Sequence, residues 1–149
     1  ESQEKAKVAL TRDHDKIFNS PNQITLGNPK GDVTVVEFYD YNCGYCQRAM
    51  ADMQKLISED SNIRFVLKEF PIFGERSIGA HKVSVAVSHI APEKYQDFHI
   101  KLFSLQGQKT AERAMKVAAD LGIHAHNCSD VNRSQFMVST KIYQLTYTL

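Results

Sequence analysis

The spacing of hydrophobic residues changes twice between residues 33 and 70, and this change constrains the fold more than any other feature of the sequence. Residues 33–39 (VTVVEFY) are β-branched, aromatic and almost continuously apolar, which is typical of a strand buried on both faces. After Cys46 the apolar residues follow helical spacing: Ala49, Met50, Met53, Leu56 and Ile57. Residues 63–70 (IRFVLKEF) again favour a strand, which Pro71 would end. We therefore expect two parallel neighbouring strands joined by a helix, and an α/β fold.

The second half of the chain has helical spacing throughout. Four helices are expected there, over residues 77–90, from Pro92 onward, over residues 110–122 and from about Ser129 onward. Thr110 is a suitable N-cap for the third helix, and Gly122 is a suitable C-cap. One face of the second helix should hold Tyr95, Phe98, Leu102 and Phe103. One face of the fourth should hold Val131, Val138, Ile142, Leu145 and Leu149.

The first 31 residues differ from the rest in composition. Residues 1–18 are predicted to form a polar helix with few apolar positions, which fits either a solvated arm or a dimerisation helix. Residues 19–31 are predicted to be a linker because they hold four turn-forming residues: Pro21, Gly27, Pro29 and Gly31. The expected organisation is a helical arm (1–18), a strand–helix–strand half (19–73) and a helical domain (74–149).

The composition excludes several classes of function. The 149 residues are 42% hydrophobic, which is enough for one domain with a core. Eighteen basic and seventeen acidic residues give a net charge of +1, so electrostatic binding to nucleic acid has no basis here. No apolar stretch approaches the ~20 residues that span a bilayer. Three cysteines are too few for a disulfide scaffold, and an odd number cannot all pair within one chain.

Two of the cysteines, Cys43 and Cys46, lie where the first expected strand gives way to the helix. A thiol at a helix N-terminus meets unpaired backbone N–H groups and the positive end of the dipole, which lower its pKa from ~8.5 to about 3.5–7.5. Cys43 would then be a thiolate nucleophile at neutral pH. Cys46, one helical turn later, is suited to close a disulfide with Cys43 or to resolve a mixed disulfide. The spacing therefore favours redox chemistry.

Metal binding is the main alternative interpretation of the cysteines. A structural zinc site needs four ligands, and the other candidates, His124, His126 and Cys128, lie far along the sequence. These three alternate after Gly122, so in an extended segment they would point the same way and would suit copper or zinc. An ordinary surface loop is the simpler interpretation of this segment. An inert, buried cysteine pair is the remaining alternative, and no resident metal or cofactor is predicted.

Three segments and one set of side chains carry a family resemblance. The segments are 27–32 (GNPKGD), 36–46 (VEFYDYNCGYC) and 68–72 (KEFPI), and the set is Tyr95, Phe98, His99, Leu102 and Phe103. Together they resemble the DsbA family, bacterial thiol–disulfide oxidoreductases of the cell envelope. The Gly-Tyr pair between the cysteines is more similar to isomerase-type and copper-tolerance-associated members than to the oxidase. The resemblance covers residues 19–122 and implies a thioredoxin-like core with an inserted helical domain.

The resemblance also implies roles for three residues. Cys43 matches the exposed nucleophile of the family, and Cys46 matches the buried resolving cysteine. Glu37 matches the acidic residue beneath the active site, which tunes the thiols and assists proton transfer. From the residues alone, a carboxyl in an apolar strand should have a raised pKa and is able to accept the Cys46 proton. The alternative is that Glu37 pairs with a cation such as Lys68.

One departure from the family pattern concerns the end of the chain. Family members continue past the inserted helices into a loop whose cis-proline faces the two cysteines, and then into two strands and a helix. The prolines here are Pro21, Pro29, Pro71 and Pro92, and none follows the helical half. We therefore expect the C-terminal strands and one wall of the substrate groove to be missing, which leaves a sheet edge exposed. A truncated chain, a natural variant and a fold completed by another molecule each fit this pattern.

The leading hypothesis is a thiol–disulfide oxidoreductase of the periplasm or another extracytoplasmic compartment. The implied partners are protein substrates with thiols or disulfides and a membrane partner that recycles the cysteine pair. A homo-oligomer, linked through Cys128, is compatible with the odd cysteine count. The alternatives are a copper-binding or chaperone-like envelope protein and an inactive, truncated homologue. The sequence does not determine whether the pair oxidises, reduces or isomerises disulfides.

Overall fold

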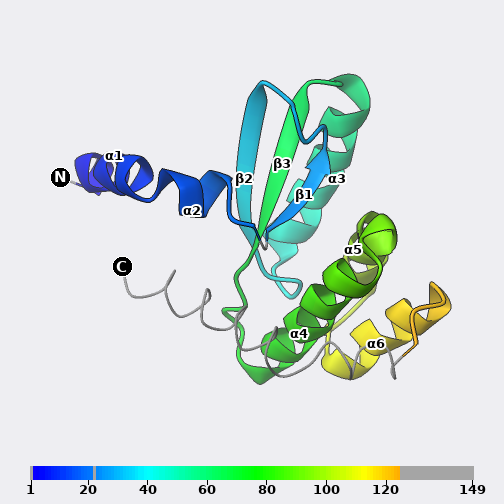
Figure 1. The fold of residues 1–149 in the computed structure, drawn as a ribbon. Coiled ribbons are helices and arrows are strands. Elements are labelled where there is room, and N and C mark those ends of the chain that lie inside the picture. Colours follow the sequence, from blue (N-terminus) through cyan, green and yellow to red (C-terminus); the bar gives the residue numbers. More distant parts are fainter. Residues whose placement is uncertain (1, 22, 125–149) are drawn as a thin grey trace. The chain divides into compact units, whose positions relative to one another are not determined.

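The computed structural model describes residues 2–21 and 23–124 (Figure 1). In chain order its elements are α1 (Ser2–Arg12), α2 (His14–Phe18), β1 (Ile24–Gly27), β2 (Val33–Tyr39), α3 (Gly44–Glu59), β3 (Ile63–Glu69), α4 (Glu75–Ile90), the 3₁₀ helix η1 (Pro92–Lys94), α5 (Tyr95–Ser104) and α6 (Ala111–Asp120). They divide into two compact units. Within the described residues, the sheet unit comprises the chain up to Glu37 and Leu56–Lys68, and the helical unit comprises Phe38–Lys55 and Glu69–His124.

β3 is the central strand of a three-stranded sheet, with β1 on one side and β2 on the other (Figure 1). β1 runs antiparallel to β3, and its register places Ile24 opposite Leu67 and Gly27 opposite Arg64. The central position gives β3 the most buried side chains of the sheet: Ile63, Phe65, Val66 and Leu67.

The strand–helix–strand prediction is confirmed over β2, α3 and β3. The Val33 N–H at the start of β2 bonds to the Asn62 carbonyl just before β3, and the Phe70 N–H just after β3 bonds to the Tyr39 carbonyl at the end of β2. The start of β2 therefore lies beside the start of β3, and the end of β2 lies beside the end of β3, so the two strands are parallel. The prediction that β2 is buried on both faces is wrong, since only Tyr39 of this strand is fully buried. Among the described strands β2 has a neighbour on one side only, which explains its exposure.

The prediction of a linker over residues 19–31 is wrong where β1 forms. Four residues are too short a run to show strand periodicity, and their strand conformation depends on pairing with β3. The turn that follows is fixed by Asn28, whose N–H donates to the Ile63 carbonyl at 2.9 Å and whose side-chain amide donates to the Ser61 carbonyl at 2.9 Å. Gly27 leads into this turn with φ of 74°, a conformation that glycine adopts without strain.

Helices α4, α5 and α6 pack against one another in the helical unit. The predicted helix over residues 77–90 is confirmed as α4, and the segment opened by Pro92 begins with η1 before it continues as α5. All four side chains expected to share a face of this segment are buried: Tyr95, Phe98, Leu102 and Phe103. The helix predicted from Ser129 onward lies outside the described residues.

Both predicted caps of α6 are confirmed. The Thr110 hydroxyl accepts the Arg113 N–H at 3.4 Å at the start of the helix. At the other end Gly122 has φ of 76°, and the next N–H, of Ile123, bonds to the Ala118 carbonyl at 2.9 Å. Such a left-handed glycine satisfies the last carbonyl groups of a helix.

The N-terminal segment is helical, as predicted, but it forms two helices instead of one. α1 ends at Arg12 and α2 begins at His14. The intervening Asp13 carboxylate bonds to the Arg12 guanidinium at 2.7 Å and to the Lys16 ammonium at 3.1 Å. Whether this segment is a solvated arm or a dimerisation helix stays a prediction.

Candidate active site

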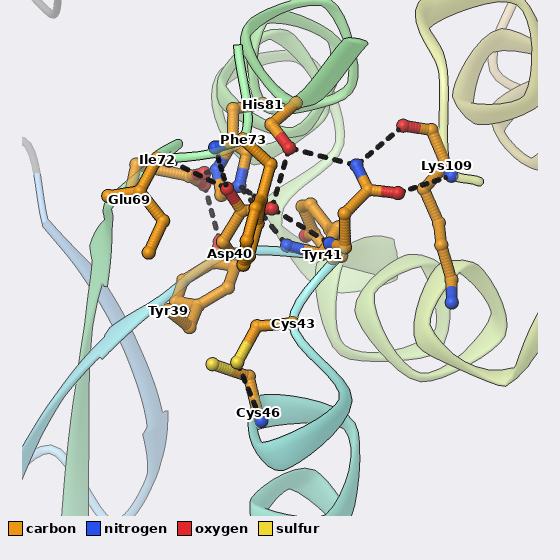
Figure 2. A network of polar contacts seen from close by, with 12 residues as sticks. Tyr39, Asp40, Tyr41, Cys43, Cys46, Glu69, Ile72, Phe73, His81 and Lys109 are labelled. Atoms are coloured by element: carbon orange, nitrogen blue, oxygen red, sulfur yellow. Dashed lines mark hydrogen bonds and ion pairs between the residues drawn. The ribbon is translucent and has the colours of Figure 1, made fainter.

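Cys43 and Cys46 lie at the start of α3, after a loop of residues 40–42 that follows β2 (Figure 2). The Cys43 carbonyl accepts the Gln47 N–H at 3.0 Å, so Cys43 caps the helix. The Cys46 backbone nitrogen lies 3.4 Å from the Cys43 sulfur and donates its hydrogen to it. The structure therefore brings the two cysteines together at a helix N-terminus, as the sequence predicts.

The surroundings of Cys43 favour its thiolate. Burial by itself raises the pKa of this thiol, and the nearby Asp40 carboxylate also raises it. Hydrogen bonds from the Cys46 side chain and from the backbone N–H groups of Cys46 and Tyr45 outweigh these effects, and the pKa of Cys43 is lowered from its ordinary value of 9.0. A lowered pKa increases the fraction of the nucleophilic form at neutral pH.

The cysteine motif is open to a reactant. Both cysteines are partly exposed, and no disulfide joins them in the structure. A side-chain carbon placed at Gly44 would meet no atom within 4 Å. Tyr45 is 78% exposed, and the Arg48 guanidinium lies 4.8 Å from the centroid of its ring. A substrate sulfur therefore has room to approach the pair.

Asp40, the first residue of the loop, is buried and accepts hydrogen bonds on both carboxylate oxygens (Figure 2). Oδ1 accepts from the Asn42 N–H at 2.8 Å and from the Ser77 hydroxyl at 2.8 Å. Oδ2 accepts from the backbone N–H groups of Ile72 at 2.7 Å and Phe73 at 3.2 Å. One carboxylate thus joins the loop before the cysteines to the segment after β3 and to α4.

His81 on α4 lies between two carboxylates. Its Nδ1 contacts Glu69 Oε2, and its Nε2 is 3.8 Å from Asp40 Oδ1. Burial lowers the pKa of His81, but the two carboxylates overcome this effect and raise it to about 9. Burial raises the pKa of Asp40, but hydrogen bonds from His81 and other donors lower it to about 2. The Asp40–His81–Glu69 cluster therefore holds two carboxylates and one imidazolium at neutral pH.

Buried hydroxyl groups of the helical unit extend the network of this cluster. Glu69 Oε1 accepts from the Tyr39 hydroxyl at 2.6 Å and from the Ser84 hydroxyl at 2.7 Å. The Tyr95 hydroxyl lies 2.9 Å from each of these two hydroxyl groups. The Tyr41 hydroxyl is 2.9 Å from that of Ser84. These bonds satisfy polar groups that would be costly to bury alone.

His99 is a packed core histidine. It is buried on α5, with Nδ1 2.9 Å from the Tyr41 hydroxyl. Burial lowers its pKa to about 4, so the ring is neutral at physiological pH. A neutral ring accounts for its place in an aromatic core beside Phe103, with ring centroids 4.9 Å apart.

Asn42 fixes the other side of the loop before Cys43. Its side-chain oxygen accepts the Lys109 N–H at 2.7 Å, and its amide donates to the Lys109 carbonyl at 3.0 Å and to the Ser77 hydroxyl at 2.9 Å. The segment between α5 and α6 is thereby joined to the cysteine loop. Helix α4, through Ser77, and the segment before α6, through Lys109, therefore both contribute to the position of the motif.

Glu37, the third predicted site residue, lies on β2 in the sheet unit and is half-buried. Burial raises its pKa above the ordinary value of 4.5, which confirms the prediction for a carboxyl in an apolar strand. Lys68, the alternative partner, donates its ammonium to the Lys16 carbonyl at 3.0 Å and to Gln23 Oε1 at 2.9 Å. Among the ion pairs of the described residues, none joins Glu37 to Lys68.

Sequence reasoning did not find Asp40, Glu69 and His81. Asp40 has a local signal, because it is an acidic residue in an apolar run close to the cysteines. Glu69 and His81 have no local signal, because the sequence does not indicate which charged side chains come into contact in the folded protein. Their assignment to one cluster required the tertiary structure.

The segment of the alternative metal-binding interpretation is only partly described. His124 is exposed, whereas His126 and Cys128 lie outside the described residues. Within residues 2–21 and 23–124, no group of three or more histidine, cysteine or acidic side chains is arranged to hold a metal ion. No helix in the same ranges has the length and apolarity needed to cross a membrane.

Comparison with known proteins assigns this chain to a family. The model of a family described as thioredoxin matches residues 19–144. A relative from Bacillus subtilis (strain 168), described as disulfide bond formation protein D, is 32% identical over 100 residues, which cover 62% of this chain and 45% of the relative. The chain therefore spans less than half the length of that protein.

Two solved structures extend the comparison to the fold. A thioredoxin-like oxidoreductase from Silicibacter pomeroyi DSS-3 has 37% sequence identity and a TM-score of 0.80, over 90% of this chain and 77% of the other. The thiol–disulfide exchange protein α-DsbA2 from Wolbachia pipientis has 28% identity and a TM-score of 0.81, over 97% and 75%. With its cysteine pair at the start of α3 and its mixed α/β fold, this chain belongs to the thioredoxin family and is DsbA-like.

Proposed function

We propose that this chain catalyses thiol–disulfide exchange in protein substrates through Cys43 and Cys46. The observation that carries the proposal is the helix-capping position of Cys43, where three hydrogen-bond donors lower its pKa. The reaction requires a partly exposed thiolate with a second thiol beside it. The names of the Bacillus and Wolbachia relatives support the same chemistry.

In the oxidising direction the reaction starts from a Cys43–Cys46 disulfide. A substrate thiolate attacks Cys43 Sγ, a mixed disulfide forms, and the electron pair of the broken bond leaves on Cys46. A second substrate thiolate then attacks the substrate sulfur and releases Cys43 as a thiolate. The net result is one substrate disulfide formed and one enzyme disulfide reduced.

In the reducing direction the same steps run backward; isomerisation starts with the same attack by Cys43, but a substrate thiolate then breaks the mixed disulfide and the enzyme stays reduced. The Cys43 thiolate attacks a substrate disulfide, and Cys46 then attacks Cys43 Sγ to release the substrate thiol. Cys46 must lose its proton for this second step. Glu37 is the proposed acceptor, because its raised pKa gives it a higher proton affinity than an ordinary carboxylate.

The proposed substrates are proteins with thiols or disulfides, and the proposed location is the periplasm or another extracytoplasmic compartment. Disulfide chemistry on proteins persists in oxidising compartments, which supports this location. Each turnover changes the redox state of the cysteine pair. We therefore include a membrane partner that restores the starting state as part of the proposal.

The test is reduction of insulin by dithiothreitol, followed by precipitation of the freed B chain. The wild type should accelerate the reaction, and Cys43→Ser should return it to the uncatalysed rate. Cys128→Ser is the matched control, since it also removes one thiol and should keep the wild-type rate. Equal rates for the wild type and Cys43→Ser would refute the proposed activity.

A further inference from the structure

The Asp40–His81–Glu69 cluster has a charge arrangement that the exchange reaction does not itself use. Two carboxylates share one imidazole between them, and both contacts are largely shielded from solvent. The aromatic rings that pack on His81 are those of Tyr39 and Tyr41, with centroids 5.3 Å and 4.8 Å away. The titratable groups around His81 come from three elements and the loop after β2: Asp40, Tyr39, Tyr41, Glu69, Tyr95 and His99.

Asp40 is the member of the cluster that reaches the cysteine motif. Its backbone carbonyl accepts the Cys43 N–H at 3.0 Å. Its carboxylate holds the Asn42 N–H and, on the other oxygen, the N–H groups of Ile72 and Phe73. A rotation of this carboxylate would break bonds on both sides of the loop, so its orientation controls where Cys43 sits.

We propose that His81 is a positioning residue that acts on Cys43 through Asp40: its ring lies between the Asp40 and Glu69 carboxylates and offsets the negative charge that Asp40 places near the thiol. The role of Cys43 as nucleophile rests on the proposed function. The link from His81 to Cys43 is measurable without any substrate, so the two proposals can fail separately.

The contacts of His81 Nε2 differ between its two protonation states. This nitrogen lies 3.3 Å from the Tyr41 backbone nitrogen and 3.8 Å from Asp40 Oδ1. Only a neutral ring can accept the Tyr41 N–H, whereas an imidazolium donates toward Asp40. Loss of the proton therefore removes the cation from Asp40, and this change occurs as the pH rises through the His81 pKa of about 9.

The experiment compares the thiolate titration of Cys43 in the reduced wild type and in His81→Gln. Alkylation by iodoacetamide is followed at a series of pH values, with Cys43 resolved from the other cysteines by peptide mass spectrometry. Asp40 keeps its remaining donors in the variant and stays ionised, so its uncompensated charge should raise the Cys43 pKa. We expect a rise of about half a unit, or about threefold less thiolate below the midpoint.

Two further variants separate charge from structure. His81→Arg keeps a cation at this position and should restore the wild-type midpoint. Tyr95→Phe removes a buried hydroxyl that bonds to Tyr39 and Ser84 and lies 3.5 Å from Glu69 Oε1 but contacts neither Asp40 nor His81. It should lower stability and leave the Cys43 midpoint unchanged. An unchanged midpoint in folded His81→Gln, or an equal shift in Tyr95→Phe, would overturn the proposal.

A measurement on the wild type covers the case in which the His81 variants do not fold. The ¹⁵N shifts of the His81 ring should be those of an imidazolium at pH 7 and should titrate near pH 9. As the ring titrates, the amide signals of Tyr41 and Cys43 should move with the same midpoint. A neutral His81 at pH 7, or amide signals that do not respond, would overturn the proposal.

Discussion

Cys43 and Cys46 belong to one four-residue motif but have different surroundings. Cys43 caps α3 and has a thiol whose pKa is lowered by donors from Tyr45 and Cys46. Cys46 lies within the first turn and turns its N–H toward the Cys43 sulfur. This asymmetry assigns the attacking role to Cys43 and the resolving role to Cys46 in the proposed reaction.

The asymmetry predicts different products for the two serine variants. Cys46→Ser keeps the nucleophile but cannot resolve, so it should accumulate a mixed disulfide with a cysteine-containing peptide disulfide. Cys43→Ser should accumulate much less. Intact mass spectrometry after acid quenching measures both adducts, and equal accumulation would contradict the assignment of roles.

Glu37→Gln should stabilise the protein at neutral pH. Burial raises the pKa of Glu37, so the folded state binds the proton more tightly than the unfolded state does. Stability is then lost as the pH rises from about 4.5 through the folded pKa. Glutamine does not ionise, so the variant should be the more stable protein at pH 7, by an amount that solvent at this half-buried site keeps small.

Urea unfolding of both proteins at pH 4 and pH 7 measures this effect. The gain should be larger at pH 7, and a gain that is equal at the two values would show that ionisation is not its cause. The same variant tests the proposed proton acceptor. Its reductase rate should fall on the order of tenfold or more.

The secondary-structure elements are fixed by two kinds of signal. α6 has local signals at both ends, since Thr110 caps its start and Gly122 ends it. β1 has no such signal and exists through its register with β3. Elements of the first kind are predictable from sequence, and those of the second kind are not.

Gly27→Ala, at the end of β1, and Gly122→Ala, after α6, should lower the free energy of unfolding by different amounts. Gly27 and Gly122 both have positive φ, at 74° and 76°, which costs alanine about 1–2 kcal/mol. An added Cβ at Gly122 would meet Lys94 Nζ at 3.6 Å, an ordinary contact, whereas at Gly27 it would meet the Ile63 carbonyl oxygen at 2.6 Å. Gly27→Ala should therefore be the more destabilising change.

Urea denaturation with a common m-value compares the two variants. The Gly122→Ala cost should stay near the conformational value, and that of Gly27→Ala should exceed it by about 1 kcal/mol or more. Equal losses of unfolding free energy in the two variants would show that the turn after β1 shifts to make room for the added Cβ.

At the scale of the whole molecule, buried charge makes stability depend on pH. The pKa of Asp40 is lowered from 3.8 to about 2, so its contribution is present above pH 3.8 and is lost as the pH falls toward 2. The pKa of His81 is raised from 6.5 to about 9, so its contribution is present below pH 6.5 and is lost as the pH rises toward 9. Stability should be greatest between these limits, with each loss on the order of 2 kcal/mol.

Urea unfolding across this pH range measures the profile, in a Cys43→Ser background that removes the titration of the reactive thiol. Asp40→Asn should flatten the acid side, and His81→Gln should flatten the alkaline side. An acid side that is unchanged in Asp40→Asn would contradict the assignment, since other carboxyl groups would then control acid unfolding.

Much of the fold and the core of the candidate site could be predicted from local patterns. The change in hydrophobic spacing around Cys46 predicts the parallel strands and α3, and the position of Cys43 ahead of that helix predicts a reactive thiol. The burial of β2 could not be predicted in this way, because burial depends on how many neighbours a strand has. Its half-exposed side chains follow from its place beside β3 in the sheet.

The sequence by itself determined that Cys43 has a thiol of lowered pKa with a second thiol one turn later. The reason is that a helix N-terminus affects the pKa of groups within one turn of it. Only the tertiary structure decided what holds that motif in place. Asp40, Glu69 and His81 come from separate elements, and their pKa values depend on contacts that form when those elements pack. Electrostatic effects of this kind act through space, so a linear pattern of residues does not contain them.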